Sequence, residues 1–104
     1  MRILFDHGTP VPLRREIFGH EIYTAYEMGW ASLSNGELLK AAEVMFDAMV
    51  TTDKNLRYQQ NMAGRRLAIL VLPTTSWPKI QQQLAKVNDA VHQLKAGDFR
   101  ELDF

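Results

Sequence analysis

Short apolar segments alternate along the chain with segments whose apolar positions have helical spacing. The apolar segments cover residues 2–5, 20–25, 48–51 and 67–72, and each has the length of a β-strand. The last two are almost continuous apolar runs, which is typical of parallel strands covered on both faces. Strands that alternate with helices in this way predict an α/β fold with a mainly parallel four-stranded sheet and helices on both of its faces.

Two helical segments begin with residues that favour a helix start. Residues 10–17 follow a Gly-Thr-Pro turn and fit a short helix that begins near two prolines. A longer helix is predicted for residues 34–46, because Ser34 and Glu37 have the spacing of a capping box. Its apolar positions recur every three or four residues and so form one buried stripe.

The last helix is predicted for residues 77–94, with Gly97 just beyond its end. Its apolar residues are four, three, four and three positions apart, which is typical of a helix that packs along a narrow seam. The seam consists of Ile80, Leu84, Val87, Val91 and Leu94. We expect it to be buried either against the sheet or against the same helix of a second copy in a homodimer.

The composition is that of one ordinary globular domain. The chain has 104 residues, of which 46% are apolar and 23% charged, so we interpret residues 1–104 as a single domain. It has no cysteine, which excludes disulfide bonds and metal sites with thiolate ligands. No apolar run is long enough to span a membrane. The first strand follows Met1 directly, without room for a signal peptide, so we expect a cytoplasmic location.

Positive and negative charges balance, with twelve Lys and Arg against twelve Asp and Glu. The whole molecule therefore exerts no long-range attraction on nucleic acid, and contact with RNA must come from a local group of basic residues. Four candidates follow Asp53 closely in the sequence: Lys54, Arg57, Arg65 and Arg66. The same run also fits an ordinary solvated helix face and turn.

Two aspartates follow strands that are predicted to lie side by side. Asp6 follows the first strand and Asp53 the third, and in the strand order 2-1-3-4 these strands are neighbours about 4.8 Å apart. Ligands of open parallel sheets bind beyond the carboxyl ends of the strands. Two carboxylates this close repel each other unless a cation lies between them, and Mg²⁺ prefers such oxygen ligands. We therefore predict a metal site here, although each aspartate alone also fits a turn or a helix cap.

Four short motifs resemble a known family in their order and spacing. They are Ile-Leu-Phe-Asp-His-Gly-Thr-Pro at residues 3–10, Gly-His-Glu-Ile at 19–22, Ser-Asn-Gly-Glu-Leu-Leu at 34–39 and Met-Val-Thr-Thr-Asp-Lys-Asn-Leu at 49–56. The chain resembles, over most of its length, the small PIN-like domain family related to VapC toxin ribonucleases. The resemblance implies a Rossmann-like, PIN-type three-layer sandwich. In active members it also implies a Mg²⁺ or Mn²⁺ ion, held by acids at the strand ends, for the hydrolysis of RNA.

The resemblance also implies roles for particular residues. Asp6 and Asp53 match the catalytic, metal-binding acids of the family. At His7, Asn35 and Asn55 many members carry an acid, so three expected carboxylates are neutral here and the ion would be held weakly. The residues that would support the site are His7, Asn35, Glu37 and Asn55. Glu37 also fits the capping box, and a histidine at a strand end also fits a hydrogen-bonded structural role.

Three functions are consistent with these residues. The first, which the resemblance implies, is a toxin-type ribonuclease that is paired with a small antitoxin protein. The second is a degenerate PIN-like domain that has lost catalysis and binds RNA or a protein partner. The third is a phosphoacceptor receiver domain. It fits least, because a receiver needs two adjacent acids after its first strand and a fifth strand that ends in lysine.

Overall fold

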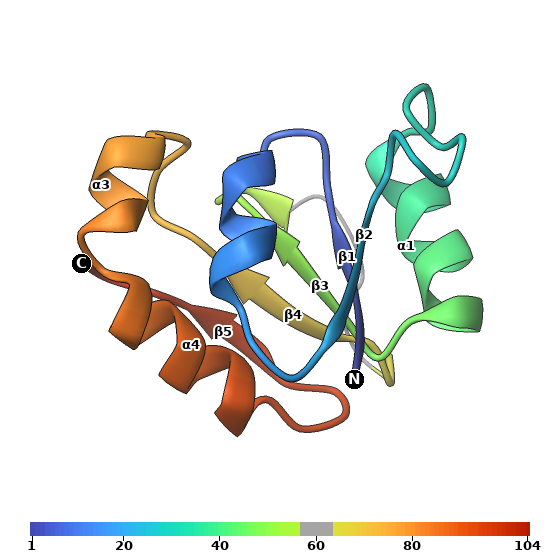
Figure 1. Ribbon diagram of the computed structural model, residues 1–104. Helices are drawn as coiled ribbons and strands as arrows, with labels where there is room; N and C mark the ends of the chain where they lie inside the picture. Colours follow the sequence, from blue (N-terminus) through green and yellow to red (C-terminus); the bar gives the residue numbers. More distant parts are fainter. Residues whose placement is uncertain (57–63) are drawn as a thin grey trace.

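The strands of the chain form one parallel sheet. The computed structural model describes residues 1–56 and 64–104, and in these ranges the sheet has five strands in the order β2-β1-β3-β4-β5 (Figure 1). Each pair of neighbouring strands is parallel. The strands are β1 (Arg2–Phe5), β2 (Glu21–Thr24), β3 (Ala48–Thr51), β4 (Ala68–Val71) and β5 (Phe99–Glu101). The predicted parallel α/β architecture and the order of the first four strands are therefore confirmed.

The predicted number of four strands is wrong, because β5 adds a fifth. This strand extends the sheet beyond β4, where Phe99 is the partner of Ile69. It has only three residues and exposes Arg100 and Glu101, so it contains no apolar run. A short, charged strand of this kind is typical of a sheet edge, where the backbone N–H and C=O groups on one side have no neighbouring strand to pair with.

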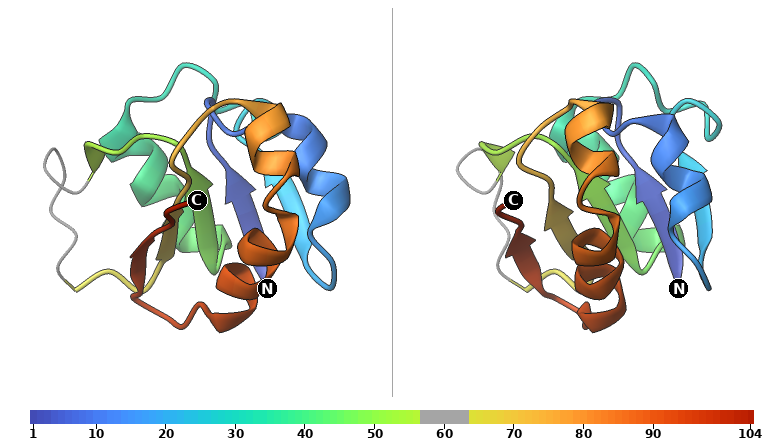
Figure 2. Two further views of the ribbon diagram at one scale, coloured as in Figure 1. Left: turned by 90° about the vertical axis from the view of Figure 1, so that its left-hand side faces the viewer. Right: turned by 60° about the vertical axis from the view of Figure 1, so that its left-hand side comes forward.

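The side chains of each strand alternate between two hydrophobic cores, one on each face of the sheet. Ile3 and Phe5 point into one core and Leu4 into the other, as the two-residue period of a strand requires. Helices cover both faces and complete three layers (Figure 2). On the first face, which we call the α4 face, they are the 3₁₀ helix η1 (Val11–Glu16), α3 (Trp77–Gln81) and α4 (Leu84–Gln93). On the second, the α1 face, the helix is α1 (Asn35–Met45).

Helix α1 begins with the predicted capping box. The Ser34 hydroxyl accepts a hydrogen bond of 3.3 Å from the backbone N–H of Glu37, and the Glu37 carboxylate accepts one of 3.1 Å from that of Ser34. These bonds satisfy two N–H groups near the helix start. Leu38 and Leu39 then point into the core of the α1 face. The cap thereby fixes Asn35, the first residue of the helix, close to the end of β3.

The last helix is broken, which corrects the single helix predicted for residues 77–94. It ends at Gln81 and starts again at Leu84, with a turn in which the N–H of Gln83 donates to the carbonyl of Ile80. Glutamines are good helix formers, so the composition here gives no signal of a break.

None of the described helices is long and apolar enough to cross a membrane.

The seam on this broken helix packs on the sheet of its own chain. Ile80, Val87 and Val91 are fully buried in the core of the α4 face, and Leu94 is 7% exposed. Leu84 is partly buried and packs against the same core. The prediction that the seam is buried is confirmed in its first form, against the sheet. A homodimer through the same residues would require the helix to leave the sheet.

The connection between β4 and β5 has the opposite hand to the β1–β2 and β2–β3 connections. From β1 to β2 the chain moves in one direction along the sheet and crosses the α4 face. From β2 to β3 it moves in the opposite direction along the sheet and crosses the α1 face. Both connections are therefore right-handed (Figure 2). From β4 to β5 the chain moves along the sheet in the same direction as from β2 to β3, but it crosses the α4 face, so this connection is left-handed. Crossovers between parallel strands are right-handed in about 98% of cases, so this left-handed one is rare. It places α3 beside η1.

Candidate functional site

Asp6 and Asp53 lie at the carboxyl-terminal edge of the sheet, after strands that are direct neighbours. Asp6 follows β1, and its backbone N–H donates a 3.1 Å hydrogen bond to the carbonyl of Val50 in β3. Asp53 is the second residue after the end of β3. Both aspartates therefore lie at the same edge of the sheet, as the predicted strand order requires.

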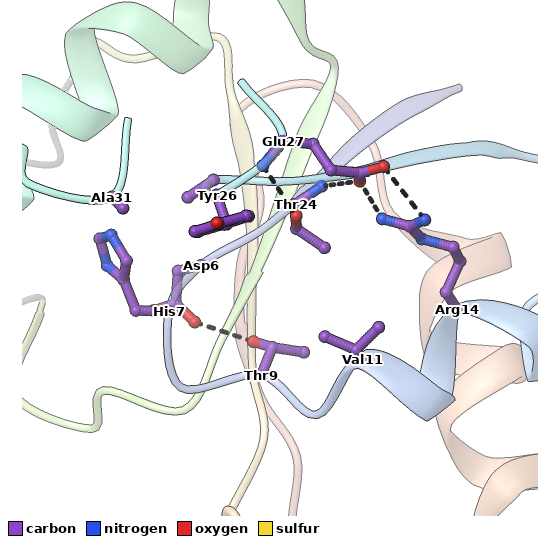
Figure 3. A pocket seen from close by; sticks show the side chains of 10 residues that line it. Asp6, His7, Thr9, Val11, Arg14, Thr24, Tyr26, Glu27 and Ala31 are labelled. Atoms are coloured by element: carbon purple, nitrogen blue, oxygen red, sulfur yellow. Dashed lines mark hydrogen bonds and ion pairs between the residues drawn. The ribbon is translucent and has the colours of Figure 1, made fainter. Parts of the chain in front are cut away.

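The carboxylate of Asp6 accepts hydrogen bonds from two loops. Its Oδ1 accepts from the Thr9 hydroxyl at 2.8 Å, as Figure 3 shows, and from the backbone N–H of Gly8 at 3.2 Å. Its Oδ2 accepts from the Thr51 hydroxyl at the end of β3. Gly8 has no room for a side chain, because a Cβ there would collide with the Thr52 hydroxyl. The loop after β1 thus packs closely against the end of β3.

A single hydroxyl group joins the two aspartates. Thr51 Oγ1 donates to Asp6 and accepts a 3.0 Å hydrogen bond from the backbone N–H of Asp53. The carboxylate of Asp53 accepts in turn from the Asn35 side-chain amide at 2.9 Å and from the backbone N–H of Asn55 at 2.9 Å. β1, β3 and the start of α1 therefore contribute to one hydrogen-bonded group.

Burial raises the pKa of the Asp6 carboxyl above its ordinary value of 3.8. Hydrogen bonds from Thr51, Thr9 and Gly8 lower this pKa, as does the positive charge of His7, but burial has the larger effect. The ionised carboxylate is therefore less favourable in the folded chain than in the unfolded one. A cation bound to Asp6 would offset that cost.

Asp6→Asn is expected to raise the melting temperature of the protein at neutral pH in EDTA. Because the pKa of Asp6 is raised on folding, ionisation of this carboxyl lowers the stability of the fold as the pH rises above 3.8. An amide avoids the charge, and its oxygen still accepts from Thr9 and Gly8. Thermal unfolding between about pH 3.5 and about pH 7.5 measures the effect. The melting temperature of the variant should increase relative to that of the wild type as the pH rises. A variant that melts below the wild type at every pH would contradict the prediction.

Thr51→Val is expected to lower the free energy of unfolding by about 1–3 kcal/mol, since it leaves polar groups of both aspartates without a partner. Valine has nearly the shape of threonine, and Thr51 is only 1% exposed, so packing should change little. Urea unfolding measures the loss. Thr51→Ser keeps the hydroxyl and removes one methyl group, so it should cost less than Thr51→Val. If Thr51→Ser lowered the free energy of unfolding more than Thr51→Val, the loss would be due to packing and not to the hydroxyl.

The four supporting residues reach this edge in different ways. Asn35 faces Asp53 through its side chain, whereas Asn55 contributes its backbone N–H and is exposed. Glu37 serves the capping box, and hydrogen bonds from Ser34 lower the pKa of its carboxyl. His7 is exposed beside Asp6. Of these side chains, those of Asn35 and His7 therefore lie beside the aspartates.

The candidate basic residues do not gather at one place. Lys54 is exposed at the carboxyl edge, directly after the second aspartate. Arg65 and Arg66 precede β4 at the opposite edge, where Arg65 forms an ion pair of 3.6 Å with Glu43. Arg57 lies outside the described residues. Among the described candidates, Lys54 alone is next to the aspartates.

The site offers oxygen atoms as ligands for a metal ion. They belong to the carboxylates of Asp6 and Asp53, the hydroxyl of Thr51 and the side-chain amide of Asn35. Mg²⁺ and Mn²⁺ prefer such oxygen ligands, and Mg²⁺ usually keeps several of its waters. Within residues 1–56 and 64–104, no group of three or more His, Cys, Asp or Glu is placed to hold a metal. The donors therefore fit a hard cation that remains partly hydrated.

A pocket of about 470 Å³ opens beside Asp6, next to the ends of β1 and β2 (Figure 3). It is lined by Asp6, His7, Thr9, Val11, Arg14, Thr24, Ala25, Tyr26, Glu27 and Ala31. The Arg14 guanidinium is held by both carboxylate oxygens of Glu27, and one of these also accepts from the backbone N–H of Thr24 at 2.9 Å. Tyr26 is 81% exposed. The pocket thus has an ion pair in one wall and an exposed aromatic ring.

Sequence reasoning missed three residues of this region. Thr9 has a signal in the sequence, because an aspartate followed three residues later by threonine is typical of a turn closed by side chains. Thr51 also has one, since a threonine in a buried apolar strand needs a hydrogen-bond partner. Tyr26 has none, because its place at the pocket depends on the path of the loop after β2.

A fifth strand is present, as in a receiver domain, but neither of the two requirements stated above is met. β5 ends at Glu101 and is followed by Leu102 and Asp103, so it does not end in lysine. Asp6 is followed by His7, so the adjacent pair of acids that a receiver needs after its first strand is absent. The residues at the edge fit a phosphoacceptor site poorly.

The geometry at the carboxyl edge is the basis from which a function can be inferred. It consists of two linked aspartates, their hydroxyl and amide partners, and the pocket beside Asp6. No protein-family model, no curated protein and no solved structure matches the chain.

Proposed function

We propose that the chain is a PIN-like ribonuclease of the toxin type, which cleaves RNA with Mg²⁺ or Mn²⁺. Asp6 and Asp53 are the proposed metal ligands and catalytic residues. The observation that carries the proposal is their link through Thr51, which joins acids from two adjacent strands where open parallel sheets bind ligands. The motifs that resemble the PIN-like family contain all three residues, which supports the same assignment.

Each residue at this edge has a role in the proposed reaction. Asp6 and Asp53 provide the negative charge that attracts a divalent cation. Thr51 holds the Asp6 carboxylate and the backbone N–H of Asp53, and Asn35 holds the Asp53 carboxylate. What a bound divalent ion supplies here is a water molecule of lowered pKa and a positive charge beside the phosphate oxygens. The His7 imidazole, exposed beside Asp6, can serve as a general acid or base. Lys54, exposed at the same edge, can attract the phosphates of the RNA.

Asn35 has a positioning role in this proposal. Its amide donates to the Asp53 oxygen Oδ2 and so orients the carboxylate without adding charge. A third carboxylate at this position would hold a cation more tightly than an amide does. The proposed enzyme therefore needs a higher concentration of metal than one with three acids at this edge.

Incubation of the purified chain with an end-labelled single-stranded RNA tests the proposal. Cleavage is expected with Mn²⁺ or Mg²⁺ and none is expected with EDTA, because the carboxylates act through a bound cation. Asp6→Asn, purified in the same way, controls for a contaminating nuclease. If the wild type cleaves no member of a panel of unrelated RNAs at millimolar Mn²⁺, or if both proteins cleave equally, the proposal is wrong.

The second candidate is a degenerate PIN-like domain that binds RNA or a protein without cleavage. It is favoured by the number of acids, since no group of three metal-binding side chains occurs in the described part of the chain. Binding of RNA in a gel-shift assay that is equal in Mn²⁺ and in EDTA, without cleavage, would support this candidate.

A small antitoxin protein is the proposed partner of the active enzyme. A neighbouring gene that encodes a small helical DNA-binding protein would support this pairing. Inhibition of the Mn²⁺-dependent cleavage by that purified protein would then test it directly. Cleavage at an unchanged rate in its presence would contradict the pairing.

A further inference from the structure

We infer that the pocket beside Asp6 binds one unpaired base of the RNA, so that the substrate is a single strand. The inference rests on the proposed function, because Asp6 lines the pocket and is also a proposed metal ligand. A base in the pocket would place the phosphate attached to its ribose near the carboxyl edge. The pocket would therefore select the position on the strand at which the metal site acts.

The pocket has the size and the lining of a site for a small, largely apolar group. Its volume of about 470 Å³ lies within the range of small-molecule sites. Val11, Ala25 and Ala31 contribute apolar surface to its walls. Tyr26 is 81% exposed and Val11 is 57% exposed, so two large side chains at the pocket have little cover from the protein. A base stacked on the Tyr26 ring would cover them.

The charges at the pocket favour a neutral group over an anion. The guanidinium of Arg14 is paired with both oxygens of Glu27, so its positive charge is balanced within the wall. The Asp6 carboxylate accepts from neutral donors, the hydroxyls of Thr9 and Thr51 and an N–H group. A phosphate inside the pocket would be repelled by this carboxylate, whereas a base is neutral. A nucleotide would therefore insert its base and leave its phosphate at the mouth.

The arrangement of the labelled side chains agrees with this orientation. In Figure 3 the rings of His7 and Tyr26 lie near Asp6, and the Arg14–Glu27 pair lies at the other end of the pocket. A base between these groups meets an aromatic face near the site and hydrogen-bonding groups at the other end of the pocket. A base of a duplex must first unstack and unpair to enter such a pocket, which costs free energy, so the pocket favours a single strand.

Titration of the isotope-labelled protein with adenosine 5′-monophosphate in EDTA, followed by NMR, tests the inference without metal or catalysis. The backbone amides of Val11, Tyr26 and Ala31 are expected to shift. Tyr26→Ala should weaken binding about tenfold, as the loss of one stacking contact does, and Tyr26→Phe should retain it. Phe18→Ala is the matched control, because Phe18 is also an exposed aromatic residue, at 65%, and does not line the pocket. Ribose 5-phosphate, which lacks the base, should produce no shifts at these amides.

The outcomes separate this inference from the proposed function. If the nucleotide binds as described and no RNA is cleaved, the nuclease proposal fails and the base site remains. If RNA is cleaved with Mn²⁺, but Tyr26→Ala cleaves a single strand at the wild-type rate and the nucleotide causes no shifts, the pocket inference alone fails. Equal weakening by Tyr26→Ala and Phe18→Ala, or equal binding of ribose 5-phosphate, would also overturn it.

Discussion

Asp6→Asn and Asp53→Asn are each expected to reduce the proposed Mn²⁺-dependent RNA cleavage by at least about 100-fold while the fold stays intact. An amide keeps the shape of the side chain but loses the negative charge that draws a hard cation from its water shell. The magnitude is a lower bound, because even residues that only orient a metal ligand change affinity or activity by about 10- to 100-fold. Initial rates on an end-labelled single-stranded RNA measure the loss, and circular dichroism checks the fold.

Asp89→Asn is the matched control for these two variants. Asp89 is an exposed acid on α4, so the substitution removes the same charge at a distance from the carboxyl edge. It should cleave RNA at the wild-type rate. A similar loss in Asp89→Asn would assign the effect to net charge, and full activity in Asp6→Asn would place the metal site elsewhere.

The parts of the fold that could be predicted are those in which burial dictates the residue type. The strands β3 and β4 are buried on both faces, so their sequences are continuous apolar runs of strand length. β5 could not be predicted, because an edge strand of three residues is held by backbone hydrogen bonds, which leave no pattern in the side chains. The break before Leu84 is invisible for a similar reason, since the glutamines at the break also suit a continuous helix.

The candidate site was predictable where it depends on strand order and not where it depends on loops. Asp6 and Asp53 follow strands whose adjacency can be derived from the βα pattern. The place of Tyr26 depends on a loop whose path the sequence does not encode in any periodicity. Thr51 lies between these cases, since it is a strand residue whose hydroxyl has to find a partner.

The basic residues show how closeness in sequence can mislead. Lys54 and Arg65 are near each other in the chain but lie at opposite edges of the sheet. Parallel strands require this, because the chain leaves β3 at the carboxyl edge and must return to the amino edge before β4 begins. A basic run that spans such a connection is therefore divided between the two edges of the sheet.

Asn35→Asp is expected to make the stability of the protein depend strongly on Mn²⁺. In the wild type the Asn35 amide donates to Asp53 at 2.9 Å, so the substitution replaces an attractive hydrogen bond by two facing carboxylates. Their repulsion at neutral pH amounts to about 1–4 kcal/mol, depending on how well water screens it. In EDTA the variant should therefore melt at a lower temperature than the wild type.

Addition of Mn²⁺ should reverse that loss, because a third carboxylate strengthens the site and the cation removes the repulsion. At a concentration 100 times the Kd, binding to the folded state stabilises it by about 2.7 kcal/mol. For a domain of this size that corresponds to a rise in Tm of roughly 10–20 °C. The wild type should need more Mn²⁺ for the same rise, and calorimetric titration of both proteins gives the two affinities.

Asn55→Asp separates this effect from the general attraction of a cation to a more negative protein. It adds the same charge two residues after Asp53, but at an exposed position whose contact with Asp53 is made by the backbone N–H. That contact survives the substitution, so Asn55→Asp should match the wild type in EDTA and gain little Mn²⁺ affinity. If Mn²⁺ raises the melting temperature strongly in Asn35→Asp and not in Asn55→Asp, the result would support a cation held between α1 and β3. Equal responses in both variants would mean that position 35 does not face the metal, and the resemblance to the PIN-like family would then be misleading at that residue.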